Sequence, residues 1–217
     1  MTADEGPDAV LPSMKAPLLP VSALVALPIV LPSCSQREPG TSADHASTAH
    51  FSTADAERAL AALDVVYEVL QHPRCLNCHP AGDRPLQYDA GRPHGMNVVR
   101  GPDDGGVAGM RCVGCHGDAN APLPHMPPGV STGWRLAPRE MVFEGLSKRE
   151  LAEVLLDPER SHMTPDELLH HIAHDPLVLW GWEPGPGREP VPVAHADFVA
   201  AFTTWIEAGA PASAESE

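Results

Sequence analysis

The sequence predicts an all-α fold with few helices, separated by long Gly/Pro-rich loops that wrap around a cofactor. Helix-start signatures precede apolar residues that recur at three- and four-residue intervals. The chain of 217 residues contains 25 Pro and 18 Gly, and aromatic residues make up only 5% of it. Residues 80–139 follow neither a helical nor a strand period, and so long an irregular segment is unusual in a compact domain. A bound cofactor would explain it by completing the core.

Residues 1–34 have the order of an export signal that ends in a lipidation site. From Met14, one lysine precedes an uncharged apolar run, which leads through small residues to Cys34. The segment LPSC at 31–34 resembles the lipobox of bacterial lipoproteins, although its proline is uncommon there. Residues 1–13 carry acids and no basic residue, so we expect the true start at Met14. The run is too short and too interrupted by proline to span a membrane. We therefore predict a periplasmic protein anchored to the bacterial membrane through Cys34, with a free or disulfide-bonded Cys34 as the alternative.

A single folded domain is expected at 53–211, between a linker at 35–52 and a disordered tail at 212–217. The linker is rich in Ser, Thr, Ala and Pro, a composition typical of a flexible tether. The length of the chain also favours one ordinary domain.

Four segments of this domain carry helix signals. The sequence STAD at 52–55 begins a helix whose apolar face continues until Pro73 stops it. Further capping boxes, at 147–150 and 164–167, predict two short helices. Residues 195–208 have apolar and aromatic residues at helical spacing, which predicts a closing helix that packs across the first. Little or no sheet is expected.

Two copies of the pattern C-x-x-C-H are the strongest functional signal. They consist of Cys75, Cys78 and His79 in the first copy, and of Cys112, Cys115 and His116 in the second. Covalent haem needs two thiols spaced to add to its vinyl groups, and a histidine directly after them to ligate the iron. The sequence therefore predicts two haem c groups in a cytochrome c-like domain, with the cysteines as attachment points and the histidines as proximal ligands.

Two other sites use similar cysteine patterns. A zinc ribbon also repeats C-x-x-C after a few tens of residues, but zinc does not need a histidine after each pair, and export favours haem or disulfides. A thioredoxin-like motif lies between a strand and a helix, whereas Cys75 follows a helix broken by Pro73. Both remain as alternatives to haem.

Several segments around these motifs carry a resemblance to a known family. They read RCLNCHPAGDRPLQ, HGMNVVRGPD, GMRCVGCHGDAN, WRLAP, FEGLS and DPLVLWGWEPGPGREPVPVAH, and they span about Leu70 to Pro211. The chain resembles the two-haem c-type cytochrome proteins labelled isoquinoline 1-oxidoreductase subunit. The cysteines and histidines of both motifs match the family's haem motifs residue by residue. The label implies an electron-transfer subunit that accepts electrons from a molybdenum hydroxylase-type dehydrogenase and passes them to a downstream acceptor.

The ligand on the other side of each iron is usually Met or His. We expect His94 and His171 as distal ligands, with Met96, Met141 and Met126 as alternates. A buried methionine is more often a core residue, and a histidine on a polar helix face is more often solvated. Haem propionates have candidate partners in Arg92, Arg100 and Arg111, since guanidinium pairs with carboxylate in a bidentate way. His195 is a further candidate, for a propionate contact or as a helix cap.

The charge of the chain limits its partners. The formal net charge of −15 argues against nucleic acid, which demands clustered Lys and Arg. A redox protein partner is expected, with the chain as a non-catalytic carrier. Two alternatives remain: a peroxidase in which one iron keeps an open position, and a haem-based sensor of small gases.

Overall fold

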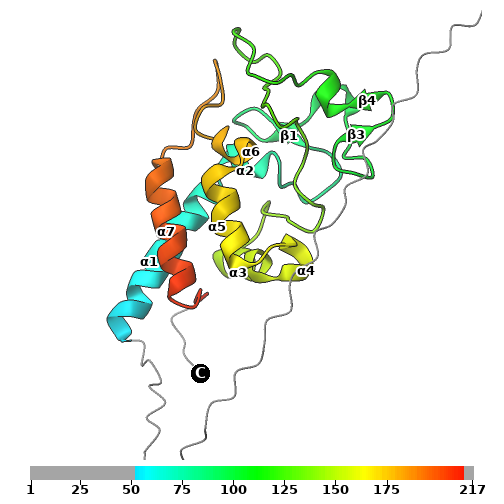
Figure 1. Ribbon diagram of the computed structural model, residues 1–217. Helices are drawn as coiled ribbons and strands as arrows, with labels where there is room; N and C mark the ends of the chain where they lie inside the picture. The colour runs from blue at the N-terminus through cyan, green and yellow to red at the C-terminus, as the bar shows by residue number, and fades with distance from the viewer. Residues whose placement is uncertain (1–51, 213–217) are drawn as a thin grey trace, which may run out of the picture. The chain divides into compact units, whose positions relative to one another are not determined.

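The structure is a computed structural model that describes residues 52–212 (Figure 1). Helices make up 42% and strands 5% of these residues, so the all-α prediction is confirmed at the level of a helix-dominated domain. Cys34, with the predicted signal and almost all of the linker, lies outside the described residues, as do residues 213–217 of the tail. No helix within 52–212 is both long and apolar enough to cross a membrane.

The first and last helices lie side by side and form the main helix pair (Figure 1). The first, α1 (Thr53–Leu70), begins with the expected capping box between Ser52 and Asp55. The last, α7 (His195–Glu207), ends before Gly209, which adopts a positive φ. Both boundaries agree with the sequence prediction, and so does the packing of α7 on α1.

Four helices lie between the loop region and α7. They are α3 (Lys148–Leu156), α4 (Pro158–Ser161), α5 (Pro165–His174) and α6 (Pro176–Leu179). The two predicted capping boxes are formed at the starts of α3 and α5. The short α4 and α6 were not predicted. Each begins with an Asp N-cap, Asp157 or Asp175, followed by Pro at the first helical position, a signal that the sequence already carries.

The middle of the chain is irregular, as its composition indicated. Between the single turn α2 (Pro73–Leu76) and α3, its regular elements are two hairpins and two turns of 3-10 helix. These are β1 (Leu86–Gln87) with β2 (Arg92–Pro93), η1 (Gly95–Asn97), β3 (Gly106–Val107) with β4 (Met110–Arg111), and η2 (Cys112–Gly114). Both hairpins are antiparallel, with Leu86 opposite Pro93 and Gly106 opposite Arg111. Gly106 has φ +90°, and a Cβ there would lie 2.5 Å from the Met110 carbonyl oxygen, so only glycine fits.

Aromatic residues of α7 form the centre of the core. Phe202 is fully buried and lies edge-on between Phe198 and Trp205, at centroid distances of 6.0 and 5.4 Å. The Trp205 indole donates a hydrogen bond to the Pro211 carbonyl, which holds the chain beyond α7 against the helix. Such edge-to-face pairs add about 0.5–1.5 kcal/mol each to the free energy gained by burial.

Replacement of Phe202 tests this arrangement. We expect Phe202→Ala to lower the free energy of unfolding by about 3–5 kcal/mol, because α1 and α7 cannot close fully on the cavity left behind. The measurement is denaturant unfolding of the whole protein, followed by far-ultraviolet circular dichroism. Glu207→Ala, at an exposed position of the same helix, is the control and should change stability by less than about 0.5 kcal/mol. A loss below about 1 kcal/mol for Phe202→Ala would contradict the central role of this ring.

Candidate functional site

Both C-x-x-C-H motifs fold back in a tight turn closed by the same backbone hydrogen bond, from the histidine to the first cysteine. The backbone N–H of His79 donates to the Cys75 carbonyl at 3.1 Å, and that of His116 donates to the Cys112 carbonyl at 2.9 Å. Positions i, i+3 and i+4 share one face of a helical turn. Each turn therefore presents two thiols and one imidazole to the same side. The first motif begins in α2, whose start at Pro73 is capped by the backbone and side chain of the residue before it, and continues beyond the end of that helix at Leu76; the second begins in η2 and continues beyond Gly114.

Each motif histidine is oriented by a backbone carbonyl from a distant loop. His79 Nδ1 lies 2.7 Å from the Met141 carbonyl oxygen, and His116 Nδ1 lies 2.8 Å from that of Pro128. A carbonyl oxygen only accepts, so Nδ1 carries the proton in both rings and Nε2 has a free lone pair. This is the arrangement that orients a histidine as a metal ligand. Burial lowers the pKa of both histidines to about 4, which keeps them neutral.

An aromatic ring stacks on each of these imidazoles. Phe143 lies parallel to His79, with ring centroids 3.7 Å apart and planes inclined by 4°. Trp134 lies parallel to His116, at 4.8 Å and 8°. The backbone N–H of Phe143 also donates to the His79 carbonyl at 3.0 Å, so this loop holds the first motif through both side chain and backbone. The two motifs thus repeat the same support with different residues.

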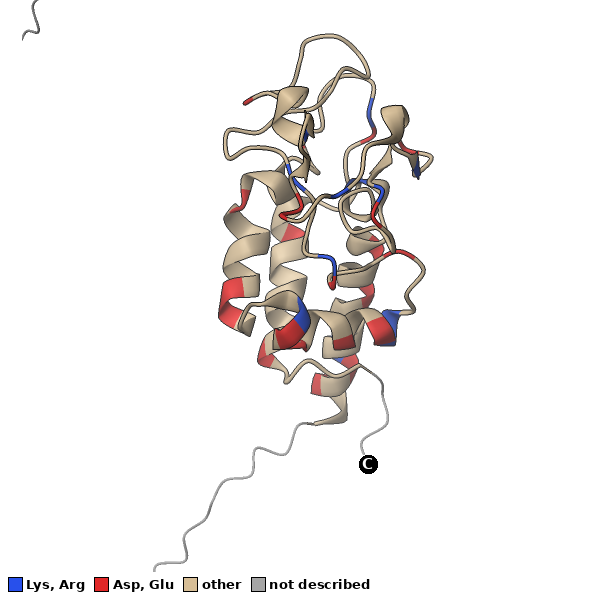
Figure 2. Cartoon of the chain, turned by 90° about the vertical axis from the view of Figure 1, so that its right-hand side faces the viewer, with Lys and Arg blue, Asp and Glu red and all other residues tan. Residues whose placement is uncertain are grey.

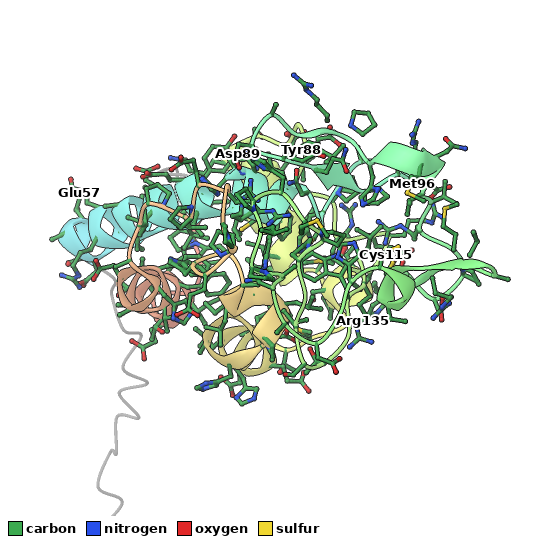
Figure 3. The ribbon with its side chains drawn as sticks, turned by 90° about the horizontal axis from the view of Figure 1, so that it is seen from above. Glu57, Tyr88, Asp89, Met96, Cys115 and Arg135 are labelled. Carbon is green, nitrogen blue, oxygen red and sulfur yellow. The ribbon has the colours of Figure 1, made fainter. Side chains whose placement is uncertain are left out.

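Two cavities adjoin the motifs. The first cavity, of ≈ 340 Å³, is lined by Cys75, Cys78 and His79, and it extends between α5 and α7. The second cavity, of ≈ 230 Å³, is lined by the second motif and by the loops of the irregular region. Four residues line both cavities, which therefore share a wall: Arg74, Cys78, Arg135 and Leu136. In Figure 3, Cys115 and Met96 of the second cavity lie at the end of the domain opposite Glu57 of α1.

The predicted distal residues divide between the two cavities. His94 and Met96 line the second cavity, and His171 and Met141 line the first. Met126 lines neither cavity. Met96 is 74% exposed. Met141 is buried, and its carbonyl already holds His79.

His94 lies opposite His116 across the second cavity. Their ring centroids are 6.2 Å apart. A metal ion bound between two imidazoles at about 2 Å from each nitrogen gives a centroid separation of about 6 Å. His94 Nδ1 contacts the Gly95 carbonyl at 2.9 Å, which again leaves Nε2 free. In the first cavity, His171 has its Nδ1 3.3 Å from Asp175 Oδ2, a carboxylate–histidine pair of the kind that orients metal-binding histidines.

The structure adds lining residues that the sequence interpretation did not select. Met163 lines the first cavity, and Met110 and His125 line the second. Nothing in the local sequence distinguishes them from other surface methionines and histidines. Arg92 lines neither cavity, whereas Arg100 and Arg111 line the second. The ring nitrogen Nε2 of His195 lies 2.9 Å from the Ile172 carbonyl, so this residue joins α7 to α5.

Basic side chains gather around the second cavity although the chain is acidic. Figure 2 shows Asp and Glu mainly on the helices, and Lys and Arg largely on the loops. The second cavity is lined by five arginines and by no Asp or Glu: Arg74, Arg100, Arg111, Arg135 and Arg188. The Nε atoms of Arg74 and Arg100 are buried without a hydrogen-bond partner among the described residues. Buried arginines with unused donors fit a cofactor that carries carboxylates.

These features fit two covalently attached haems. Each motif offers two thiols and a free Nε2 beside a cavity, and the arginines offer partners for propionates. A zinc ribbon would need all four cysteines around one ion. Here Cys75 lines only the first cavity, Cys112 and Cys115 line only the second, and Cys78 lines both. Within residues 52–212, no group of three or more His, Cys, Asp or Glu side chains is arranged to hold a metal ion.

No family model, curated protein or solved structure matches the chain.

Gly129 offers a test of the support of His116, because it follows the carbonyl of Pro128. A Cβ at Gly129 would lie 2.3 Å from the Gly117 carbonyl oxygen and 2.4 Å from that of Ala119. We expect Gly129→Ala to displace this loop and to lower the free energy of unfolding by about 1–3 kcal/mol, measured by denaturant titration.

Gly114, inside the second motif, provides the matched control. A Cβ there would meet no heavy atom within 4 Å, so Gly114→Ala should leave stability unchanged within about 0.5 kcal/mol. Equal stability of the two variants would show that the loop does not depend on the close approach at Gly129.

Proposed function

We propose that this protein is a two-haem c-type cytochrome that carries electrons between redox proteins. One observation carries the proposal: in both C-x-x-C-H turns the Nδ1–H of the histidine donates a hydrogen bond to the backbone carbonyl of another loop, which leaves Nε2 free beside a cavity. Two separate loops supply these carbonyls, so the arrangement arises twice in one chain. The passage from α1 into the first motif and the packing of α7 on α1 support a cytochrome c-like fold.

When bound, each haem would supply one iron that takes up one electron on reduction and releases one on oxidation. The chain would contribute the rest. Cys75 and Cys78, and likewise the second pair, would hold the cofactor covalently, and the motif histidines would offer Nε2 to the metal. The stacked rings of Phe143 and Trp134 restrict rotation of these histidines. The shared wall of the two cavities brings the two cofactor sites together without an intervening domain.

The partner is proposed from the family resemblance and the charge. A molybdenum hydroxylase-type dehydrogenase would deliver electrons, and a downstream acceptor would receive them. A net charge of −15 favours a partner surface that is basic where the proteins meet. Export to the periplasm and anchoring through Cys34 are part of the same proposal, because c-type haem is attached to exported chains. The protein itself is proposed to be a non-catalytic subunit.

Haem stoichiometry is the first test. Protein exported from a host with c-type maturation machinery is expected to carry two covalent haems per chain, measured by pyridine haemochrome assay and intact mass. Removal of one attachment pair, in Cys75→Ala/Cys78→Ala or in Cys112→Ala/Cys115→Ala, should leave one haem. A chain without covalent haem, or one that contains zinc or a disulfide at these cysteines, would overturn the proposal.

The distal ligands are proposed to be His94 and His171, because each lies in a cavity with a motif histidine and has its Nδ1 engaged. Histidine on both sides gives a six-coordinate, low-spin iron. We expect His94→Ala and His171→Ala each to convert one haem of two to a high-spin form, measured by absorption and electron paramagnetic resonance spectra.

The control for these variants is His125→Ala, which removes another histidine of the second cavity and should leave both spectra low-spin. One high-spin haem already present in the unmodified protein would instead favour the peroxidase alternative, which needs an open iron. A methionine-type spectrum would assign the distal position to one of the lining methionines.

A further inference from the structure

We propose that Arg74 is a shared carboxylate-binding residue at the junction of the two cavities, and that its charge sets the reduction potentials of both haems. The inference rests on the proposed function and extends it to a residue outside both motifs. Arg74 immediately precedes Cys75 and lies in α2, so the same helical turn carries it and the first motif. Arg74 lines the first cavity as well as the second.

The burial of this guanidinium is unusual for the few contacts it makes. Its side chain is 1% exposed, and its hydrogen-bonded partner among the described residues is Asp89, which is 45% exposed. Its Nε atom has no hydrogen-bond partner within residues 52–212. A guanidinium carries five N–H donors, and an unpartnered buried donor is costly. The Arg74 guanidinium therefore has unused donors that could bind a second anion besides Asp89.

Neighbouring side chains fix the position of this charge. The Trp180 ring lies beneath the guanidinium, with Cζ 5.6 Å from the ring centroid, and Arg188 approaches the same ring at 6.0 Å. Trp180 is itself held by a 2.9 Å hydrogen bond from its indole N–H to Asn120 Oδ1. These contacts hold the Arg74 guanidinium in place beside both cavities.

Haem propionate is the carboxylate that this site would take. Each haem brings two carboxylates, and Arg74 is the arginine of least side-chain exposure that lines both cavities. Arg135, which also lines both, is exposed. Reduction adds one electron to the iron, Fe(III) + e⁻ → Fe(II), and no proton is required. A fixed positive charge beside both cofactor sites would stabilise the reduced state of each iron, and would therefore raise both potentials.

The test is the pair of midpoint potentials, measured by spectroelectrochemical titration of the exported two-haem protein. Arg74→Gln should lower each of the two midpoint potentials by about 59 mV. For a one-electron couple this equals about a tenfold change in the ratio of oxidised to reduced iron at a fixed potential. Arg188→Gln removes an arginine that packs on the same Trp180 ring but lines only the second cavity, and should lower one potential. Arg149→Gln, an exposed site on α3 that lines neither cavity, makes the same formal charge change and should alter neither.

Asp89→Asn provides an independent variant with the opposite sign. It removes the negative charge that compensates Arg74. Asp89 is half-exposed, so folding should tolerate the change. Both potentials should rise, each by about a two- to threefold change in the ratio of oxidised to reduced iron. If Arg74→Gln does not assemble, this variant decides. Unchanged potentials, or a shift of one haem alone in Arg74→Gln or Asp89→Asn, would overturn the shared role. The haem content of the unmodified protein tests the proposed function separately.

Discussion

Two hydrogen bonds, from His79 to the Met141 carbonyl and from His116 to the Pro128 carbonyl, are the constraint on which the rest of the domain depends. Each joins a short turn to a loop further along the chain, 62 positions away for His79 and 12 for His116. Carbonyls in the middle of a helix or strand are engaged within that element, whereas those of loops and of helix ends are free to accept from an imidazole. The irregular middle of the chain supplies both acceptors, the carbonyls of Met141 and Pro128.

The elements and the motifs could be predicted from the sequence because their signals are local. The capping boxes at Ser52, Ser147 and Thr164 each define a helix start within four residues. The spacing within each C-x-x-C-H turn likewise fixes which atoms share a face. The Asp-Pro starts of α4 and α6 carried the same kind of local signal but were not used.

The supports of the site could not be predicted, because they depend on contacts between distant residues. Phe143 is separated from His79 by more than sixty positions, and no local pattern links the two. Arg74 illustrates the same limit. Its sequence position marks only a basic residue before a motif, whereas its burial and its place between two cavities follow from the packing of α2 against Trp180. Met163 and His125 likewise line the cavities through contacts between distant residues, which no local pattern predicts.

The two motifs share the pattern C-x-x-C-H but have unequal surroundings. Leu76 of the first motif packs against the hydrophobic core, and the stacking partner Phe143 is a member of that core. In the second motif, Val113 is 57% exposed, and Cys115 is exposed as well. Solvent exposure, charge and hydrogen bonds set the potential of a redox centre. Under the proposed function, therefore, identical attachment chemistry gives two haems of different potential, and this difference gives electron transfer within the protein a preferred direction.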